Sequence, residues 1–330
     1  MEKTTMKAVI ATGYGAPEVL AIRDIQIPTP KEKQVLIKVV VASTTRADGM
    51  MRTGKPYFGR LFTGISKPKN PIPGTGFAGE IVDTGRKVTL FNIGEMVFGE
   101  TTLGFSTNAE YVVVPEDGVI LHKPENMSFA EAATFCDGHL TSINFLKEIA
   151  KIKAGQKVLI NGASGSLGTA AVQLAKYYGA HVTGVCSERN IGLVKSLGAD
   201  RVIDYNQEDF TRSDESYDII FDTVGKSSFS ESQKVLTTEG LYISPVLKFS
   251  LLMQMLKTSL FGRKKAKFAA SGLKSDHELK DLLVELVEIY NQGKIRSIID
   301  RQFPLENVVR AHRYIANGHK RGNVVLTIQN

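Results

Sequence analysis

The chain has 330 residues, of which 42% are hydrophobic, and it carries a formal net charge of +7. This length exceeds the usual size of one domain, so we expect two domains, each with a sizeable core. No window approaches the roughly 18 uninterrupted apolar residues of a membrane span, and residues 1–6 lack the apolar stretch of a signal peptide. We therefore expect a cytoplasmic protein without a membrane as partner.

Two features of the composition narrow the possible functions. Cys136 and Cys186 are the only cysteines, too few for a disulfide framework or a multi-cysteine zinc site. The positive charge is scattered except for a cluster at residues 263–267, which lacks the interleaved aromatic residues of a single-strand nucleic-acid surface. A solvated loop is the favoured interpretation of this cluster, and nucleic acid is not an expected partner.

The first part of the chain favours β structure. Short β-branched runs, separated by Gly and Pro, occur at residues 7–10, 35–41, 78–83, 96–99 and 109–114. The pattern changes near residue 125, because Ser128 and Glu131 form a capping box at the start of a helical pattern that continues to Ala150. We therefore expect a domain boundary near residue 125.

From Lys157 onward, strand and helix patterns alternate. Strands are expected at residues 158–161, 181–186, 202–204, 218–222 and 240–244, with helices at 166–178, 191–197 and 228–236. Such alternation predicts a parallel sheet with crossover helices. The apolar stretch at residues 249–261 is expected to be a helix, either beside a ligand cleft or, as base rates favour, in the core.

A glycine-rich loop follows the strand expected at residues 158–161. Ala163, Gly165 and Gly168 have the spacing of a GxGxxG motif whose first position is Ala. Gly165 would let backbone N–H groups approach a pyrophosphate, the helix start would add its positive dipole, and Gly168 would let helix and strand pack closely. The motif alone is weak, but its place between a strand and a helix that begin alternating units predicts dinucleotide binding.

The residues after the next strand favour NADPH over NADH. NAD-binding folds place an Asp or Glu at the end of that strand to accept the ribose hydroxyls, whereas this chain has Cys186. Ser187, Arg189 and Asn190 follow and offer hydroxyl, guanidinium and amide donors to a 2′-phosphate, which an acid would repel. The alternative is that Glu188 pairs with Arg189 on a solvated loop or binds the ribose itself.

Further short motifs occur along nearly the whole chain, at residues 6–9, 48, 51–54, 73–82, 94–97, 197–205, 311–313 and 318–325. Together they resemble the zinc-free quinone oxidoreductase branch of the medium-chain dehydrogenase/reductase superfamily. The resemblance implies an α/β protein with two domains and a homodimeric state. Residues 1–125 and 273–330 would form a GroES-like β domain, and residues 126–272 a Rossmann domain with a doubly wound parallel sheet.

The zinc alcohol dehydrogenases of the same superfamily hold a catalytic metal with a Cys, a His and a second Cys. The matching positions here are Thr45, Thr75 and Asp137. Two neutral hydroxyls and one carboxylate make a poor Zn²⁺ site, so no metal is expected. Without a Lewis acid, hydride addition to a quinone or an enone needs less help than oxidation of an alcohol or reduction of a simple ketone.

The glycine loop and the resemblance together assign residues to the cofactor. They are Thr141, Ser164, Gly165, Ser166, Leu167, Ser187, Arg189, Asn190, Tyr205, Val224, Ser244, Val246 and Asn323. Ser166 and Leu167 would donate main-chain N–H groups to the pyrophosphate, and Asn323 would close over the cofactor. The others would surround the 2′-phosphate, the adenosine ribose or the nicotinamide.

The substrate side is less defined. Thr45 replaces an Asn that family members often have in the substrate cleft, and Tyr57 lies near a Tyr position of that cleft. Tyr57 would donate a proton, stack on a planar substrate or cover the core as a loop aromatic. The six histidines are dispersed and accompany no nucleophile motif. These patterns therefore identify no catalytic acid or base beyond Thr45 and Tyr57 as cleft residues, and water stays open as the proton source.

The sequence predicts a metal-independent reductase that uses NADP(H) and passes hydride to a quinone or an α,β-unsaturated carbonyl compound in a dry cleft. One alternative is an NADP-dependent alcohol or ketone dehydrogenase with a proton relay through Thr45 and Asp48. Another is an NADPH-binding sensor or structural protein of low turnover, supported only by the basic cluster at residues 263–267.

Overall fold

The computed structural model describes residues 4–55, 57, 60–269 and 274–328, and the chain divides into two compact units. Unit 1 comprises Met1–Asp137, Ser275–Val284 and Ser297–Asn330, and unit 2 comprises Gly138–Lys274 and Glu285–Arg296. Unit 1 continues past residue 125 because helix α3 (Phe129–Phe135) packs on strands of that unit. Helix α9 (Asp276–Asn291) contributes residues to both units.

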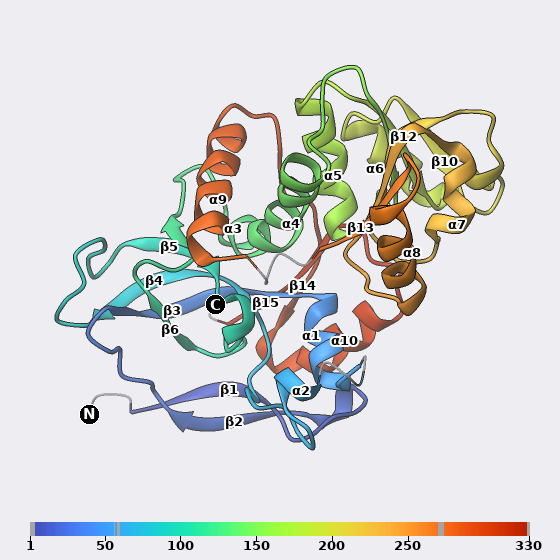
Figure 1. Ribbon diagram of the computed structural model, residues 1–330. Coiled ribbons are helices and arrows are strands. Elements are labelled where there is room, and N and C mark those ends of the chain that lie inside the picture. The colour runs from blue at the N-terminus through green and yellow to red at the C-terminus, as the bar shows by residue number, and fades with distance from the viewer. Residues whose placement is uncertain (1–3, 56, 58–59, 270–273, 329–330) are drawn as a thin grey trace. The chain divides into compact units, whose positions relative to one another are not determined.

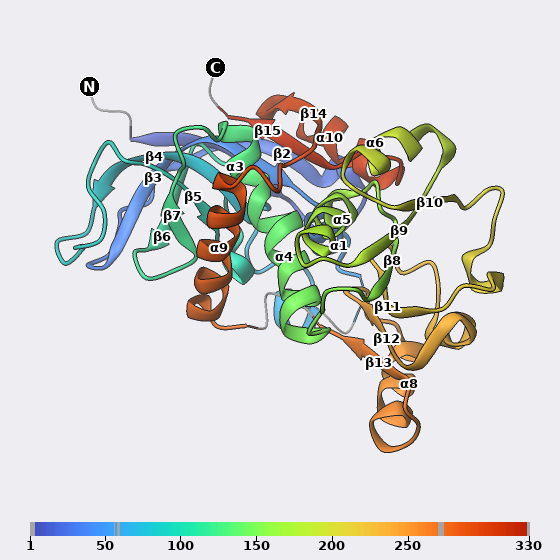
Figure 2. The same cartoon turned by 90° about the horizontal axis from the view of Figure 1, so that it is seen from above.

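Unit 2 is built on a six-stranded sheet with the order β10-β9-β8-β11-β12-β13, and Figures 1 and 2 show these strands as neighbouring arrows. The strands are β8 (Lys157–Asn161), β9 (His181–Cys186), β10 (Arg201–Asp204), β11 (Tyr217–Asp222), β12 (Leu236–Ser244) and β13 (Lys265–Phe268). All six are labelled in Figure 2, and β10, β12 and β13 are also labelled in Figure 1. Each neighbouring pair is parallel. The chain moves outward from β8 to one edge and then to the other, which is the order of a doubly wound dinucleotide-binding sheet.

Crossover helices join these strands. They are α5 (Ser166–Tyr177), α6 (Ile191–Ser196), α7 (Phe229–Ser232) and α8 (Phe249–Leu260). Right-handed crossovers on the two halves of such a sheet place helices on both of its faces. Val158, Leu159 and Ile160 of β8 are accordingly fully buried, as expected for a central strand covered on both faces. Because all strands run in the same direction, the polar residues that follow their carboxyl ends lie on the same side of the sheet.

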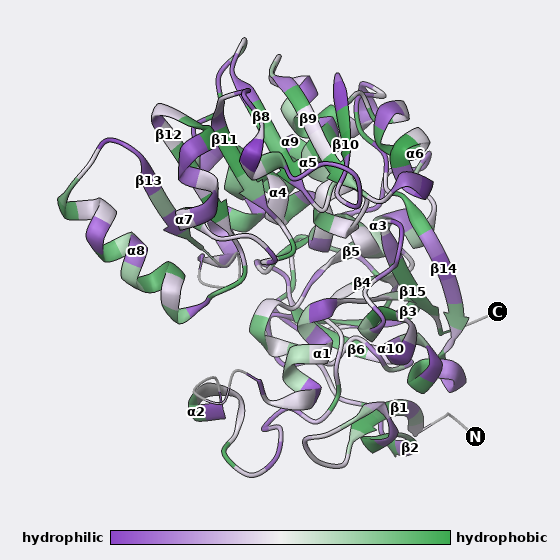
Figure 3. Cartoon of the chain, turned by 90° about the vertical axis from the view of Figure 1, so that its right-hand side faces the viewer, coloured by the Kyte–Doolittle hydropathy of each residue, from purple (hydrophilic) through white to green (hydrophobic). Residues whose placement is uncertain are grey.

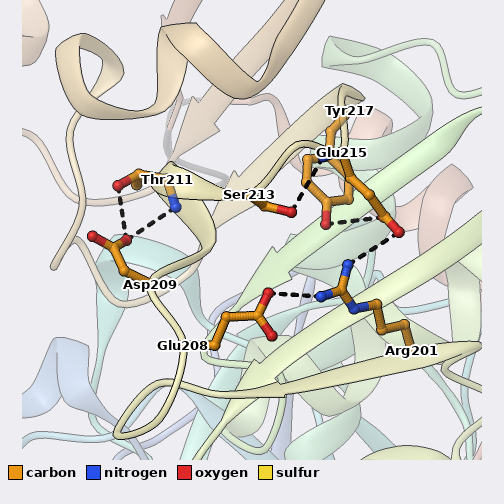
Figure 4. Close-up of polar contacts among 7 residues, drawn as sticks. All are labelled: Arg201, Glu208, Asp209, Thr211, Ser213, Glu215 and Tyr217. Carbon is orange, nitrogen blue, oxygen red and sulfur yellow. Dashed lines mark hydrogen bonds and ion pairs between the residues drawn. The ribbon is translucent and has the colours of Figure 1, made fainter.

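A small ionic network, shown in Figure 4, holds the connection from β10 to β11 near the amino-terminal ends of these two strands. Arg201 reaches Glu208 at 2.6 Å and Glu215 at 3.0 Å. The hydroxyl of Tyr217 donates to Glu215 at 3.4 Å. The side chains of Arg201, Glu208 and Glu215 are partly exposed, so each of the two ion pairs contributes on the order of 0–1 kcal/mol. Their role is to hold the crossover against the strand starts, away from the glycine loop.

The helical pattern expected over residues 128–150 forms, but it is not a single α-helix. Ser128 and Glu131 make the expected capping box at the start of α3. Two π-helical turns, Cys136–Leu140 and Asn144–Ile149, then flank the short helix α4 (Thr141–Ile143). Such π-turns occur frequently at functional sites.

Unit 1 contains a seven-stranded sheet with the order β14-β15-β3-β4-β5-β7, in which β6 also pairs with β3, and a two-stranded ribbon of β1 and β2. The strands are β1 (Thr5–Ala11), β2 (Leu20–Gln26), β3 (Gln34–Thr44), β4 (Gly76–Thr84), β5 (Met96–Glu100), β6 (Tyr111–Pro115), β7 (Ile120–His122), β14 (Ile299–Pro304) and β15 (Asn323–Thr327). The helices wholly in this unit are α1 (Arg46–Thr53), α2 (Arg60–Thr63), α3 and α10 (Val308–Ala316).

The long strand β3 organises the core of unit 1. Val35, Ile37 and Val39 are fully buried at alternate positions, as the two-residue period of a strand requires. They pack in one cluster with residues of β4 to β7, including Phe77. No helix within the described ranges is long and apolar enough to cross a membrane.

Helix α8 forms where the apolar stretch predicted a helix, but its expected place in the core is wrong for most of its side chains. Leu251 is 6% exposed and packs in the core of unit 2, whereas Phe249 is 79% exposed and Leu256 is 59% exposed. Figure 3 shows hydrophobic residues recurring along this helix. The reason is that α8 packs on β13, the last strand of the sheet, so the sheet covers only one side of the helix.

Candidate functional site

The glycine loop joins β8 to α5 at the edge where the parallel strands end. Gly162 has a φ of +82°, and a Cβ at this position would lie 2.2 Å from Val224 Cγ2. Both the left-handed backbone and the close approach require glycine.

Gly165 and Gly168 differ in what a side chain would meet. A Cβ on Gly168 would lie 2.1 Å from the carbonyl oxygen of Gly162 and 2.7 Å from Ala163 Cα, so this glycine is needed to pack the helix on the loop. A Cβ on Gly165 would meet only the Gly162 oxygen, at 3.5 Å, which is an ordinary contact. Packing between described residues therefore does not require glycine at position 165, and the space beside it fits a ligand close to the backbone.

Helix α5 begins at Ser166 beside this space. Its N-cap residue, Gly165, makes no side-chain capping hydrogen bond. The first N–H groups of a helix have no intrahelical acceptor, and together with the helix dipole they favour an anion. Ser166 and Leu167 thus lie where main-chain donors to a pyrophosphate are expected.

Three side chains expected near the adenosine half of a cofactor meet beside the loop. Asn190 Nδ2 donates to Ser164 Oγ at 3.0 Å and to Ser187 Oγ at 3.2 Å. Asn190 is 4% exposed, and its Oδ1 has no hydrogen-bond partner among the described residues. A buried acceptor without a donor is costly, so this oxygen fits a ligand hydroxyl such as that of a ribose.

The end of β9 carries no carboxylate. Cys186 is 2% exposed, and burial together with the nearby charge of Asp204 raises the pKa of its thiol to about 11. The following turn exposes Glu188 and Arg189. Tyr205 is 54% exposed, and its N–H donates to the Cys186 carbonyl at 3.1 Å. A neutral thiol, an exposed guanidinium and an exposed phenol therefore gather at this strand end.

The loops after β11 and β12 are fixed by a carboxylate that sequence reasoning missed. Asp222 is completely buried. Its carboxylate accepts hydrogen bonds from Asn161 Nδ2 at 3.0 Å, Val224 N at 3.2 Å, Gly225 N at 2.9 Å, Ser227 N at 3.1 Å, Ser227 Oγ at 2.9 Å and the Tyr242 hydroxyl at 2.8 Å. Burial and the charge of Asp222 raise the pKa of Tyr242 well above its ordinary range, so the phenol stays a donor.

Asp222 also positions the expected nicotinamide neighbours. Ser244 Oγ donates to the Asp222 carbonyl oxygen at 2.9 Å and accepts from Val246 N at 3.2 Å. Val224, Ser244 and Val246 are therefore organised around one residue. The available sequence signal was an Asp that ends a buried strand directly before a loop containing Gly225.

Thr141 and Asn323 come from other parts of the chain. Thr141 is half-buried in α4, which packs on α5, and the neighbouring Ser142 Oγ donates to the Leu167 carbonyl at 2.9 Å. Thr141 therefore lies close to the start of α5. Asn323 belongs to unit 1, where its Nδ2 donates to the Ile298 carbonyl oxygen at 3.1 Å.

In unit 1, Thr45 caps helix α1. Its Oγ1 accepts from Ala47 N at 3.1 Å and from Asp48 N at 3.4 Å, while its own N–H donates to Asp48 Oδ2 at 2.7 Å. Asp48 is fully buried and also accepts from Gly74 N at 2.9 Å, and burial raises its pKa to about 6. Thr45 and Asp48 are thus in contact, as a proton relay would need, but the same contact starts the helix.

The charge of Asp137, one of the positions that hold a metal ligand in zinc alcohol dehydrogenases, affects the pKa of several titratable side chains. Burial raises the pKa of Glu100 to about 8, and the charges of Asp137 and Asp276 add to this rise. Asp137 also adds to the raised pKa of Asp48. Burial lowers the pKa of Lys320, while Asp137 opposes that change. At neutral pH Glu100 therefore holds a proton, and the negative charge of Asp137 contributes to this.

Sequence reasoning gave no role to Glu100. It ends β5 opposite Gly76, and the adjacent Thr101 N donates to the Thr75 carbonyl at 2.9 Å. The available signal was an acidic residue closing an otherwise apolar strand. Glu100 and Asp276 also line a mainly apolar cavity of about 450 Å³ in unit 1. Within the described part of the chain, neither Thr45 nor Tyr57 lines this cavity.

Tyr57 does not cover the core, so that interpretation is wrong. It is 65% exposed, and the Arg60 guanidinium lies 4.9 Å from the centre of its ring. Proton donation and stacking on a planar substrate stay predictions for this residue.

Comparison with known proteins gives matches in both parts of the chain. Residues 31–125 match the family model of the alcohol dehydrogenase GroES-like domain, and residues 197–326 match that of the zinc-binding dehydrogenase. These matches agree with the mixed sheet of unit 1 and the parallel sheet of unit 2. The expected combination of a GroES-like domain and a Rossmann domain is confirmed.

Relatives align over nearly the full chain. A 2-methylene-furan-3-one reductase from Solanum lycopersicum is 31% identical, over 97% of this chain and 79% of the relative. A chloroplastic NADPH-dependent alkenal/one oxidoreductase from Arabidopsis thaliana is 30% identical, over 97% of this chain and 79% of the relative. Among solved structures, the quinone oxidoreductase from Coxiella burnetii is 31% identical with a TM-score of 0.87, over 98% of this chain and 100% of that one.

Proposed function

The chain belongs to the quinone oxidoreductase branch of the medium-chain dehydrogenase/reductase superfamily, and from that premise we propose that it is an NADPH-dependent oxidoreductase acting on a quinone or an α,β-unsaturated carbonyl compound. The observation that carries the proposal is the space at Gly165 between an uncapped helix start and the Ser164–Ser187–Asn190 cluster. Relatives named as reductases of furanones, alkenals and quinones support the acceptor class.

Bound NADPH supplies a hydride. The chain's own residues bind and orient the dinucleotide. The start of α5 would hold the pyrophosphate, and Asn190 Oδ1 would accept from a ribose hydroxyl. Arg189 and Tyr205 would face the 2′-phosphate at a strand end that carries a neutral thiol in the place where NAD-binding folds have an Asp or Glu. The loop held by Asp222 would position the remaining expected neighbours, Val224, Ser244 and Val246.

We further propose that the reaction needs no zinc. Thr45, Thr75 and Asp137 supply two hydroxyls and one carboxylate, a donor set that Zn²⁺ does not prefer over thiolate and imidazole. Thr45 Oγ1 already accepts from two backbone N–H groups. The model of the zinc-binding dehydrogenase family covers residues 197–326, so its match does not include these three positions.

A proton must accompany the hydride when an enone or a quinone is reduced. Glu100 lines the cavity of unit 1, and we propose it as a candidate donor because burial raises its pKa to about 8, so that its carboxyl group keeps a proton at neutral pH. A general acid with a pKa near the working pH combines the correct protonation state with a strong tendency to transfer the proton. Tyr57 is the second candidate, since its phenol is exposed.

The test is NADPH oxidation with a panel of quinones and enones, before and after treatment with a zinc chelator and metal analysis. We expect turnover with at least one acceptor and no loss after chelation. Tight NADPH binding without turnover would favour the sensor or structural alternative. Turnover confined to alcohols and simple ketones, with a pH profile set by the Thr45–Asp48 contact, would favour the dehydrogenase alternative.

A homodimer and a cytoplasmic location complete the proposal, both drawn from the expectations set by the sequence. Light scattering of the purified chain tests the first, and cell fractionation tests the second.

A further inference from the structure

Helix α8 has apolar side chains on two opposite sides. Leu251 and Met255 pack against the core of unit 2. On the other side, the side chains of Phe249, Leu252, Met253, Leu256 and Leu260 are between 49% and 79% exposed. At 3.6 residues per turn these five positions fall within about 100° of the helix circumference. We call them the outer α8 face.

The outer α8 face continues into the residue that ends the helix, since Phe261 is 71% exposed. Polar residues normally occupy the solvent side of a surface helix. A contiguous apolar patch of large side chains on a protein surface marks a site of interaction with another molecule or a membrane.

The charges around the outer α8 face have one sign. Residues 240–275 contain no Asp or Glu, whereas they contain six Lys and one Arg. Lys248 precedes the helix, Lys257 lies on its flank and Arg263 follows it, and all three are exposed. Helix α7 contacts α8 through Ser230, whose Oγ accepts from Gln254 Nε2 at 3.1 Å. The acid of α7 is Glu231, and its carboxylate accepts from Ser228 Oγ at 2.7 Å.

Two further lysines make hydrogen bonds that hold the segment after α8 in place. Lys264 Nζ donates to the Gln233 carbonyl at 2.6 Å, and Lys265 Nζ donates to the Thr258 carbonyl. These bonds connect the start of β13 to the turn that follows α7 and to α8. The basic end of the helix is therefore held in place beside the apolar face.

We propose that the outer α8 face docks on a membrane surface that contains anionic lipids. An amphipathic helix with Phe, Leu and Met on one side and lysines at its flank lies in the plane of a bilayer interface, with its apolar side in the acyl boundary. Lysine and arginine next to that boundary are attracted to anionic headgroups. The sequence expectation of no membrane partner rested on the lack of a spanning segment, which a helix lying on the surface does not need.

The same charges argue against the other occupants. A second copy placed on this face by two-fold symmetry would bring two acid-free basic segments together, and like charges repel. A nucleic acid would meet the lysines, but Leu and Met side chains offer no platform for stacked bases. An anionic bilayer is the partner that uses both the apolar face and the charge.

The test is co-sedimentation of the full chain with vesicles of phosphatidylcholine alone or with about 30 mol % phosphatidylserine. We expect at least about tenfold more bound protein on the anionic vesicles, with most of the binding lost at about 0.5 M salt. The variant L252E/L256E should bind at least about tenfold more weakly. Its matched control is L90E/I93E, which adds the same charge at two side chains of unit 1 that are 54% and 63% exposed and should bind like the wild type.

The chain contains no Trp, so an introduced one reports its own surroundings. The emission of Leu260→Trp should shift to the blue with anionic vesicles, while that of Leu90→Trp should not. NADPH oxidation without vesicles checks folding, and K257E/R263E replaces L252E/L256E should the latter lose turnover.

Binding that fails on anionic vesicles, or that L252E/L256E leaves unchanged, would overturn the proposal. So would a dimer that L252E/L256E dissolves in a protein that binds no vesicles, because the face would then belong to a second copy. Binding to single-stranded RNA in place of vesicles would overturn it as well.

Discussion

Replacing Asp222 with Ala should weaken both the fold of unit 2 and cofactor binding. The substitution removes the nearer acceptor of the hydroxyl of Tyr242, a residue that is 2% exposed, and leaves the Ser227 carbonyl oxygen at 3.2 Å. It also removes the acceptor for half-buried donors on Asn161, Gly225 and Ser227. A hydrogen bond to a charged group contributes about 1.5–3 kcal/mol, but the half-buried donors can bind water instead. We therefore expect a loss of roughly 3–5 kcal/mol in the free energy of unfolding.

The effect on the cofactor has a separate cause. Without the carboxylate, the loop that carries Val224 loses the acceptor that holds it. The Asp222 backbone can then shift, which would weaken the hydrogen bond from Ser244 Oγ to the Asp222 carbonyl oxygen. We expect the Kd for NADPH to rise by about tenfold, which corresponds to about 1.4 kcal/mol. Chemical denaturation measures the first effect, and titration of NADPH fluorescence under native conditions measures the second.

The matched control is Asp218→Ala at the other end of the same strand. Asp218 is half-buried and accepts from Lys157 N at 2.9 Å and from Thr237 Oγ1 at 3.1 Å. Because water can replace both bonds, this variant should lose only about 1 kcal/mol and keep its NADPH affinity. Equal losses in the two variants would refute the reasoning, since they would show that burial of the Asp222 network does not decide its contribution.

Three further predictions concern the rest of the site. Activity with an enone should fall as the pH rises through about 8, where Glu100 loses its proton, and Glu100→Gln should lack that pH dependence. The raised pKa also means that the free energy of unfolding of the wild type decreases from about pH 4.5 to about pH 8, because only the folded state still holds this proton in that range. Denaturation at several pH values should therefore show a flatter profile for the variant. Gly168→Ala should lower the melting temperature through its clash with the loop backbone, whereas Gly165→Ala should keep the melting temperature and weaken NADPH binding; the reverse order would contradict the assignment of the ligand space. Ser187→Asp should move cofactor preference toward NADH by about tenfold in the ratio of kcat/KM values, because a carboxylate repels the 2′-phosphate.

The sequence predicts the dinucleotide half of the protein well because its signals are local. A strand, a glycine loop and a helix start follow one another within residues 157–168, so their order alone fixes the geometry at Gly165. The parallel sheet follows from alternation along the chain, and its strand ends bring Ser187 and Asn190 toward the loop. Those residues needed no knowledge of distant contacts.

Asp222 and Glu100 escaped prediction because their surroundings come from distant parts of the chain. The Asp222 carboxylate binds groups from β8, β12 and its own loop, and no spacing along the sequence shows that convergence. The raised pKa of Glu100 depends on burial and on Asp137 and Asp276, which lie on other elements. The predicted burial of helix α8 was wrong for a related reason, because an apolar stretch does not reveal whether a neighbouring element covers each side of the helix.

Asp137 connects these observations to the proposed chemistry. A zinc enzyme uses its metal to stabilise negative charge on the substrate oxygen. In this chain the position of one metal ligand carries a carboxylate, and its negative charge adds to the raised pKa of Glu100. The carboxylate that would make zinc binding poor, as proposed above, thus also favours a nearby carboxyl group that stays protonated near neutral pH. A site of this kind would assist reduction by supplying a proton instead of a Lewis acid, which suits a quinone or an enone better than an alcohol.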